Sequence, residues 1–159
     1  MITWAKYNSR AHLVFKPETA DCRLSLSDLE LLEICCTEIS ADQDVRVAIL
    51  LSEGDNLFSG GFDINCIEKT DWRDNQFVRT IEKLEAIRPP IICALNGSVY
   101  GGACEIALAC DFRIGVNGMK LKIPAAELGL VYFAPGLKRF VSQLGLNNAK
   151  KLFLLAETF

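Results

Sequence analysis

The sequence is short of the residues on which several classes of function depend. It has one histidine, His12, and no Cys-x-x-Cys pair among its seven cysteines, so a zinc site built from Cys and His has little support. Basic residues do not outnumber acidic ones: 17 Lys and Arg stand against 20 Asp and Glu, which gives a net charge of −3 without any basic stripe. We therefore expect neither a metal site nor a nucleic-acid partner.

Long apolar runs and several nucleotide-binding motifs are also missing. No apolar stretch could span a bilayer, and the first residues lack the basic start and apolar core of a signal peptide. The GxGxxG, GxxxxGK[ST] and GxSxG motifs of dinucleotide-binding, P-loop and serine-hydrolase proteins do not occur. The cysteines are scattered and mostly lie inside apolar runs, as small hydrophobes do in a reducing compartment. These features predict a cytoplasmic protein with no membrane partner.

The patterns that are present predict an α/β fold with a largely parallel sheet. Half of the 159 residues are hydrophobic, and no repeat or linker interrupts them, so we expect one domain over residues 1–159. Apolar residues recur at helical spacing in some segments and run continuously or alternate in others. We expect strands at 1–7, 11–15, 45–51, 91–95, 112–116 and 121–123, and helices at 27–40 (with Ser27 and Glu30 as a capping box), 72–87, 103–110, 136–145 and 147–159.

Two glycine pairs follow two of the expected strands. "FSGGFDI" (58–64) contains Gly60 and Gly61, and "NGSVYGGACEI" (96–106) contains Gly101 and Gly102. Glycine pairs at helix starts let a ligand reach unsatisfied N–H groups, and two such donors from separate loops make an oxyanion hole. The alternative is that the glycines only allow tight packing of two turns against the sheet. Residue spacing alone leaves both interpretations open.

Glu105 is a carboxylate inside a very apolar run, "ACEIALAC". An unpaired carboxylate is costly to bury, so it is either hydrogen-bonded for structural reasons or kept for proton transfer with a pKa raised by desolvation.

Three motifs in order resemble those of the crotonase superfamily, the enoyl-CoA hydratase/isomerase family: "FSGGFDI", "PPIICALNGSVYGGACEIALACDFRI" and "LKIPAAELGL". The resemblance implies a spiral of ββα units that binds an acyl-CoA thioester, with coenzyme A as part of the substrate and no separate cofactor. It places the oxyanion-hole N–H groups on Phe62 and Gly102, and the acid/base carboxylate on Glu105. It further implies a homo-oligomer, a trimer or hexamer, and substrate-binding roles for Gly60, Gly61, Asp63, Gly101, Pro124 and Ala125.

The sequence departs from the family pattern at three places. Ala125 occupies the position after Pro124 where hydratases carry a second glutamate, and Tyr132 replaces a common proline, as in the methylmalonyl-CoA decarboxylase branch. Tyr132 could act on the acyl group or simply pack in a loop. The chain ends at Phe159, before the helical segment with which the family continues, so we expect a fold that lacks this segment.

These departures favour isomerase-type or decarboxylase-type chemistry over hydration, because one carboxylate of the hydratase pair is missing. We therefore expect a lyase or isomerase that forms an enolate next to the thioester, with Glu105 and Tyr132 as its catalytic side chains. The alternative is a catalytically inactive protein that keeps the fold and serves as a binding or assembly partner.

Overall fold

A computed structural model gives the fold of residues 1–16, 18–54, 56–69 and 75–159. The strands and helices follow one another in this order: β1 (Ile2–Tyr7), β2 (Arg10–Phe15), β3 (Arg23–Leu24), α1 (Leu26–Ala41), β4 (Val47–Ser52), β5 (Leu57–Ser59), β6 (Gly61–Phe62), the 3₁₀ segment η1 (Ile64–Lys69), α2 (Gln76–Glu85), β7 (Ile91–Leu95), β8 (Ser98–Tyr100), α3 (Gly102–Ala109), β9 (Phe112–Gly115), β10 (Leu121–Lys122), α4 (Ala134–Leu144) and α5 (Leu146–Leu155).

The main sheet has five strands in the order β1-β2-β4-β7-β9. The hairpin β1–β2 is antiparallel, whereas β2, β4, β7 and β9 run parallel and are therefore joined by crossover connections. One row of side chains crosses the sheet from His12 to Ile49, Ile92 and Phe112. The expected α/β class with a largely parallel sheet is confirmed.

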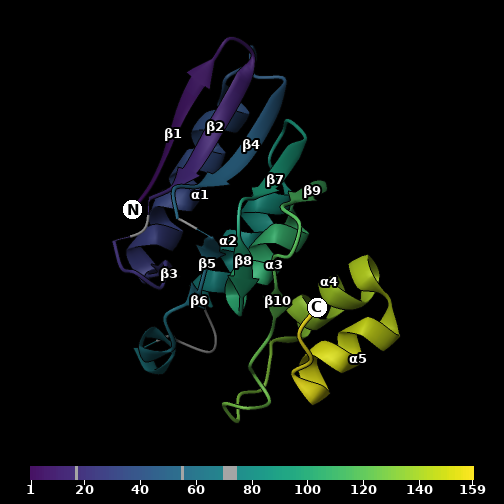
Figure 1. The fold of residues 1–159 in the computed structure, drawn as a ribbon. Coiled ribbons are helices and arrows are strands. Elements are labelled where there is room, and N and C mark those ends of the chain that lie inside the picture. Colours follow the sequence, from purple (N-terminus) through teal and green to yellow (C-terminus); the bar gives the residue numbers. More distant parts are fainter. Residues whose placement is uncertain (17, 55, 70–74) are drawn as a thin grey trace.

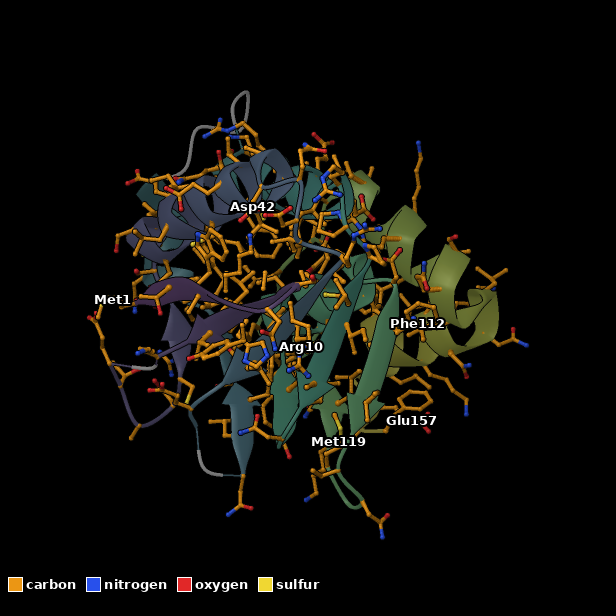
Figure 2. All side chains as sticks on the ribbon, turned by 90° about the horizontal axis from the view of Figure 1, so that it is seen from above. Met1, Arg10, Asp42, Phe112, Met119 and Glu157 are labelled. Atoms are coloured by element: carbon orange, nitrogen blue, oxygen red, sulfur yellow. The ribbon has the colours of Figure 1, made fainter. Side chains whose placement is uncertain are left out.

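The first helices cover one face of this sheet. Figure 2, seen from above, shows α1 and α2 (blue to teal) on one side of the strands. Successive side chains of a strand point to opposite faces, and those that point toward the helices are buried. Fully buried examples are Leu13 on β2, Leu50 on β4 and Cys93 on β7. The helices α1 to α5 also pack on one another in chain order, and α4 and α5 form a pair beside the sheet (Figure 1). Within the described part of the chain, no helix is long and apolar enough to cross a bilayer.

Each strand of the main sheet from β4 onward is followed by a short strand of a smaller sheet and then by a helix. The smaller parallel sheet has the order β10-β8-β5, and β3 pairs with β6 in a third. The units β4-β5-α2, β7-β8-α3 and β9-β10-α4 therefore repeat one ββα path. This is the spiral of ββα units that the resemblance implies. It brings the loops after β5 and β8 side by side, because their strands are neighbours.

Many element boundaries differ from the expectation, mostly by one or two residues, and two of the differences, at the start of α1 and the end of α5, have a clear physical cause. The helix expected from Ser27 begins after Ser25, whose side chain accepts a hydrogen bond from the Asp28 N–H, while the Asp28 carboxylate accepts one from the Ser25 N–H. The capping box is thus Ser25 with Asp28, and the expected box of Ser27 with Glu30 is wrong. The last helix ends at Leu155 instead of 159, because Ala156 adopts a left-handed conformation and Phe159 pairs with Leu121.

The second helix, α2, is described from Gln76 onward. Its expected first residues, 72–74, lie outside the described part of the chain.

Candidate active site

The two glycine pairs meet at the start of α3. Gly61 has a φ of 97°, and a Cβ atom on it would lie 2.7 Å from the Tyr100 carbonyl oxygen and 3.2 Å from the Gly102 nitrogen. Gly60 donates its N–H to the Asp21 carbonyl, and a Cβ atom there would lie 2.3 Å from that oxygen. Close packing of backbones thus requires Gly60 and Gly61. Tight packing alone therefore explains why residues 60 and 61 are glycines. The two loops nevertheless converge, as they must to form a binding site.

The first turn of α3 leaves N–H groups available at this junction. Gly101 is the N-cap with a φ of 53°, and no side chain caps the helix. Gly102 is the first helical residue, so its N–H has no partner within the helix. A Cβ atom on Gly102 would lie 3.3 Å from Phe62 Cβ and 2.9 Å from Phe77 Cζ, which shows how closely Phe62 approaches the helix start.

A cavity of about 570 Å³ opens at this junction, within the size range of small-molecule sites. Its walls are mainly apolar and come from both glycine loops, from α2 and from the segment between β10 and α4. Seven of the ten sequence-predicted site residues line it: Gly60, Phe62, Gly101, Gly102, Pro124, Ala125 and Tyr132. The other three, Gly61, Asp63 and Glu105, are not part of its lining.

Asp63 forms hydrogen bonds with residues of the neighbouring backbone and turn. Its carboxylate accepts hydrogen bonds from the backbone and side-chain amides of Asn65, at 3.1 and 2.8 Å. Its own N–H donates to the Leu24 carbonyl. Asp63 therefore stabilises the turn that follows β6, as short acidic side chains commonly do.

Glu105 is buried, with 2% of its surface exposed, and both carboxylate oxygens have donors. The Tyr132 hydroxyl donates to Oε2 at 2.6 Å, and the Arg139 guanidinium donates through Nη1 to Oε1. Burial raises the pKa of Glu105, while the hydrogen bonds from Tyr132 and the charge of Arg139 oppose that rise. Burial, followed by the nearby Glu105 charge, also raises the pKa of Tyr132. The expected buried carboxylate is thus hydrogen-bonded and ion-paired at once.

Tyr132 separates Glu105 from the cavity. Its side chain belongs to the cavity wall and its hydroxyl points to Glu105. A Cβ atom on Gly136, in the first turn of α4, would lie 2.9 Å from each Glu105 carboxylate oxygen and 2.6 Å from Tyr132 Cε1. The absence of a side chain at Gly136 therefore makes room for the hydrogen bond between Tyr132 and Glu105.

Arg139 and Glu85 complete this group, and sequence reasoning missed both. Arg139 is buried and also donates to Glu85, through Nε at 2.5 Å and Nη2 at 2.6 Å. A signal for Arg139 existed, because it lies at helical spacing with Gly136 and next to Phe140 on the buried face of α4. In the described ranges, no group of three or more His, Cys, Asp or Glu side chains could hold a metal ion.

Comparisons with known proteins agree on one family. The family model described as enoyl-CoA hydratase/isomerase matches residues 23–159. YngF of Bacillus subtilis is 32% identical over 143 residues, which cover 86% of this chain and 54% of YngF. Crotonyl-CoA hydratase of Syntrophomonas wolfei is 33% identical over 134 residues, 80% of this chain and 52% of that protein.

A solved structure extends the likeness to three dimensions. The enoyl-CoA hydratase of Bacillus anthracis superposes with a TM-score of 0.89 at 27% identity, over 99% of this chain and 64% of that one. This chain spans about half the length of the curated relatives that it matches. The sequence motifs, the ββα spiral and these matches together place the chain in the enoyl-CoA hydratase/isomerase family.

Proposed function

We propose that this chain acts on an acyl-CoA thioester bound in the cavity between the two glycine loops. The observation that carries the proposal is the convergence of the Phe62 and Gly102 backbones at the start of α3, beside a wall that holds Tyr132 and Glu105. The apolar cavity suits an acyl chain, and the family relatives named above include a crotonyl-CoA hydratase.

The chemical role of the two N–H groups follows from charge development. Removing an α-proton or a carboxylate next to a thioester places negative charge on the thioester oxygen as an enolate forms. The N–H groups of Phe62 and Gly102 would donate to that oxygen, and the N-terminal end of α3 adds partial positive charge. Each well-aimed donor contributes roughly 3 to 4 kcal/mol to the stabilisation of such a transition state.

Tyr132 is the group that would exchange a proton with the substrate, with Glu105 behind it. Tyr132 belongs to the cavity wall, whereas Glu105 reaches the cavity only through the Tyr132 hydroxyl. Tyr132 would give its hydroxyl proton to the enolate carbon, and a protonated Glu105 would return a proton to the phenolate. Burial raises the pKa of both groups and so favours their protonated forms, from which a proton would be given.

Ala125 favours isomerase-type or decarboxylase-type chemistry over hydration. Ala125 is buried in the cavity wall beside Pro124, so this side of the cavity offers a methyl group where a hydratase has its second carboxylate. Hydration needs one group to activate water and another to handle the α-proton. A single Glu105–Tyr132 pair can move one proton, which is enough for enolate protonation after decarboxylation or for transfer between two carbons.

Binding and turnover test this proposal. We expect a nonreactive thioether analogue of butyryl-CoA to bind in calorimetry, and one of three reactions to proceed: crotonyl-CoA hydration, enoyl-CoA isomerisation or methylmalonyl-CoA decarboxylation. Glu105→Gln should lower that turnover by at least about 10²-fold. The matched control is Glu127→Gln, because Glu127 is half-exposed and pairs only with Lys122 among the described residues.

No binding at millimolar analogue would contradict an acyl-CoA function. Binding without any of the three reactions would instead support the alternative of an inactive binding partner. The trimer or hexamer expected from the resemblance belongs to the same proposal, and sedimentation velocity measures it directly.

A further inference from the structure

Arg139 joins three helices through two carboxylates. It extends from α4 and donates to Glu105 on α3 and to Glu85 on α2. The two carboxylates differ in surroundings: the side chain of Glu85 is 41% exposed, whereas that of Glu105 is 2% exposed. The group therefore runs from the surface of α2 to the wall of the cavity, where Tyr132 ends it.

The Arg139 guanidinium donates more hydrogen bonds to Glu85 than to Glu105. Glu85 receives two N–H donors, Nε and Nη2, in the paired geometry that guanidinium and carboxylate groups favour. Glu105 receives one donor, Nη1. Two negative charges thus share one positive charge, so the group is one positive charge short of neutrality while both carboxylates are ionised. Protonation of the less exposed carboxylate, Glu105, removes this excess.

We propose that Glu85 is a positioning residue that acts through Arg139: by engaging two of its N–H groups, it keeps Glu105 able to take up the proton exchanged through Tyr132. This inference rests on the proposed function, since that exchange is the step it serves. Without the Glu85 charge, Arg139 would neutralise Glu105 alone and hold it as a carboxylate that accepts protons poorly.

The other charged and titratable groups around Glu105 set the direction of the effect. Arg139 of α4 and the Tyr132 hydroxyl of the preceding segment lower the pKa of Glu105, whereas burial and Glu85 of α2 raise it. On α3 itself, the neighbouring Cys104 has a thiol whose pKa burial raises strongly, so it stays neutral. Removing the Glu85 charge therefore lowers the pKa of Glu105.

The experiment measures the titration of Glu105 without substrate. Protein labelled with ¹³C at the glutamate carboxyl carbon is titrated by NMR, and Glu105 is assigned by the signal lost in Glu105→Gln. We expect Glu85→Gln to lower the pKa of Glu105 by about one unit. Glu82→Gln is the matched control, since it removes the same charge from an exposed position of α2, and it should leave that pKa within about 0.2 units of the unmodified protein.

Glu85→Asp provides the conservative rescue, because it keeps the charge and should keep the pKa of Glu105 close to its original value. An unchanged pKa in Glu85→Gln, or an equal shift in Glu82→Gln, would overturn the proposal. If Glu85→Gln does not fold, Glu85→Ala removes the same charge: a lowered pKa of Glu105 in that variant supports the proposal, and an unshifted one overturns it. Because no acyl-CoA enters this measurement, its outcome is independent of whether the proposed reaction is found.

Discussion

Tyr132 is held in the cavity wall from behind by aromatic side chains of the last two helices. Its ring lies 4.9 Å from that of Phe153 on α5, and 6.1 Å from that of Phe140 on α4 in an edge-on arrangement. With its hydroxyl bound to Glu105, the ring has contacts that fix both its position and its orientation. The packing role and the catalytic role considered from the sequence are therefore compatible, and only removal of the hydroxyl separates them.

Tyr132→Phe should lower turnover without weakening substrate binding. The ring keeps its aromatic contacts, but the proton carrier between Glu105 and the cavity is lost, so we expect kcat/KM to fall by about 10²-fold or more. The analogue of butyryl-CoA should bind within about twofold of the unmodified protein, as calorimetry measures, because the wall keeps its apolar surface. Tyr7→Phe, at an exposed position of β1, is the control. Full activity in Tyr132→Phe would remove the hydroxyl from the mechanism.

At the same scale, the sequence predicts Glu105 but not its partners. An acidic residue in "ACEIALAC" is conspicuous because its neighbours are apolar, and the structure confirms that it is buried. Glu85 lies at an exposed position of the amphipathic helix α2, and its ion pair with Arg139 is what links it to the site. That contact joins residues 54 positions apart, so no local pattern could reveal it.

Short elements position the site, and they were the hardest to predict. The helices α1 and α2 carry apolar residues at helical spacing over several turns, and both were expected from the sequence. The strands β3, β5, β6 and β8 have two or three residues each, too few to establish an alternating pattern. Their pairing across the chain, and not their local sequence, brings the two glycine loops together.

Gly61→Ala should separate these two loops. The substitution imposes strain at a φ of 97° and places a methyl group 2.7 Å from the Tyr100 carbonyl oxygen. Strained backbone costs about 1–3 kcal/mol, and the contact adds to this, so we expect the free energy of unfolding in urea to fall by more than that strain alone. Binding of the acyl-CoA analogue should weaken as well.

Gly118→Ala is the matched control for Gly61→Ala. Gly118 has a similarly positive φ of 80°, but no atom lies within 4 Å of the position that its Cβ would occupy. The free energy of unfolding of Gly118→Ala should fall by about 1–2 kcal/mol, from backbone strain alone, and binding of the acyl-CoA analogue should be unchanged. Equal losses of stability in the two variants would mean that the loops do not depend on the contact at Gly61.

The whole molecule combines a sheet covered by helices with a cavity at the edge of that core. The order of helices and strands follows from the sequence pattern, but the spiral depends on which strands pair over long distances, and only the resemblance of the motifs supplied it. The cysteines illustrate what composition can predict at this scale. Six of the seven are buried, as expected for small apolar side chains: Cys22, Cys35, Cys36, Cys93, Cys104 and Cys110.

Thiol labelling tests this core as a unit. Burial raises the pKa of Cys35 to about 11 and that of Cys36 to about 12, and only the thiolate reacts with alkylating reagents. In a short pulse of iodoacetamide at pH 8, we expect labelling at the partly exposed Cys66, with the six buried cysteines protected until urea unfolds the protein. Peptide mass spectrometry gives the extent of reaction at each site. Rapid labelling of Cys36 in folded protein would show that α1 leaves the sheet readily, contrary to a core closed by its helices.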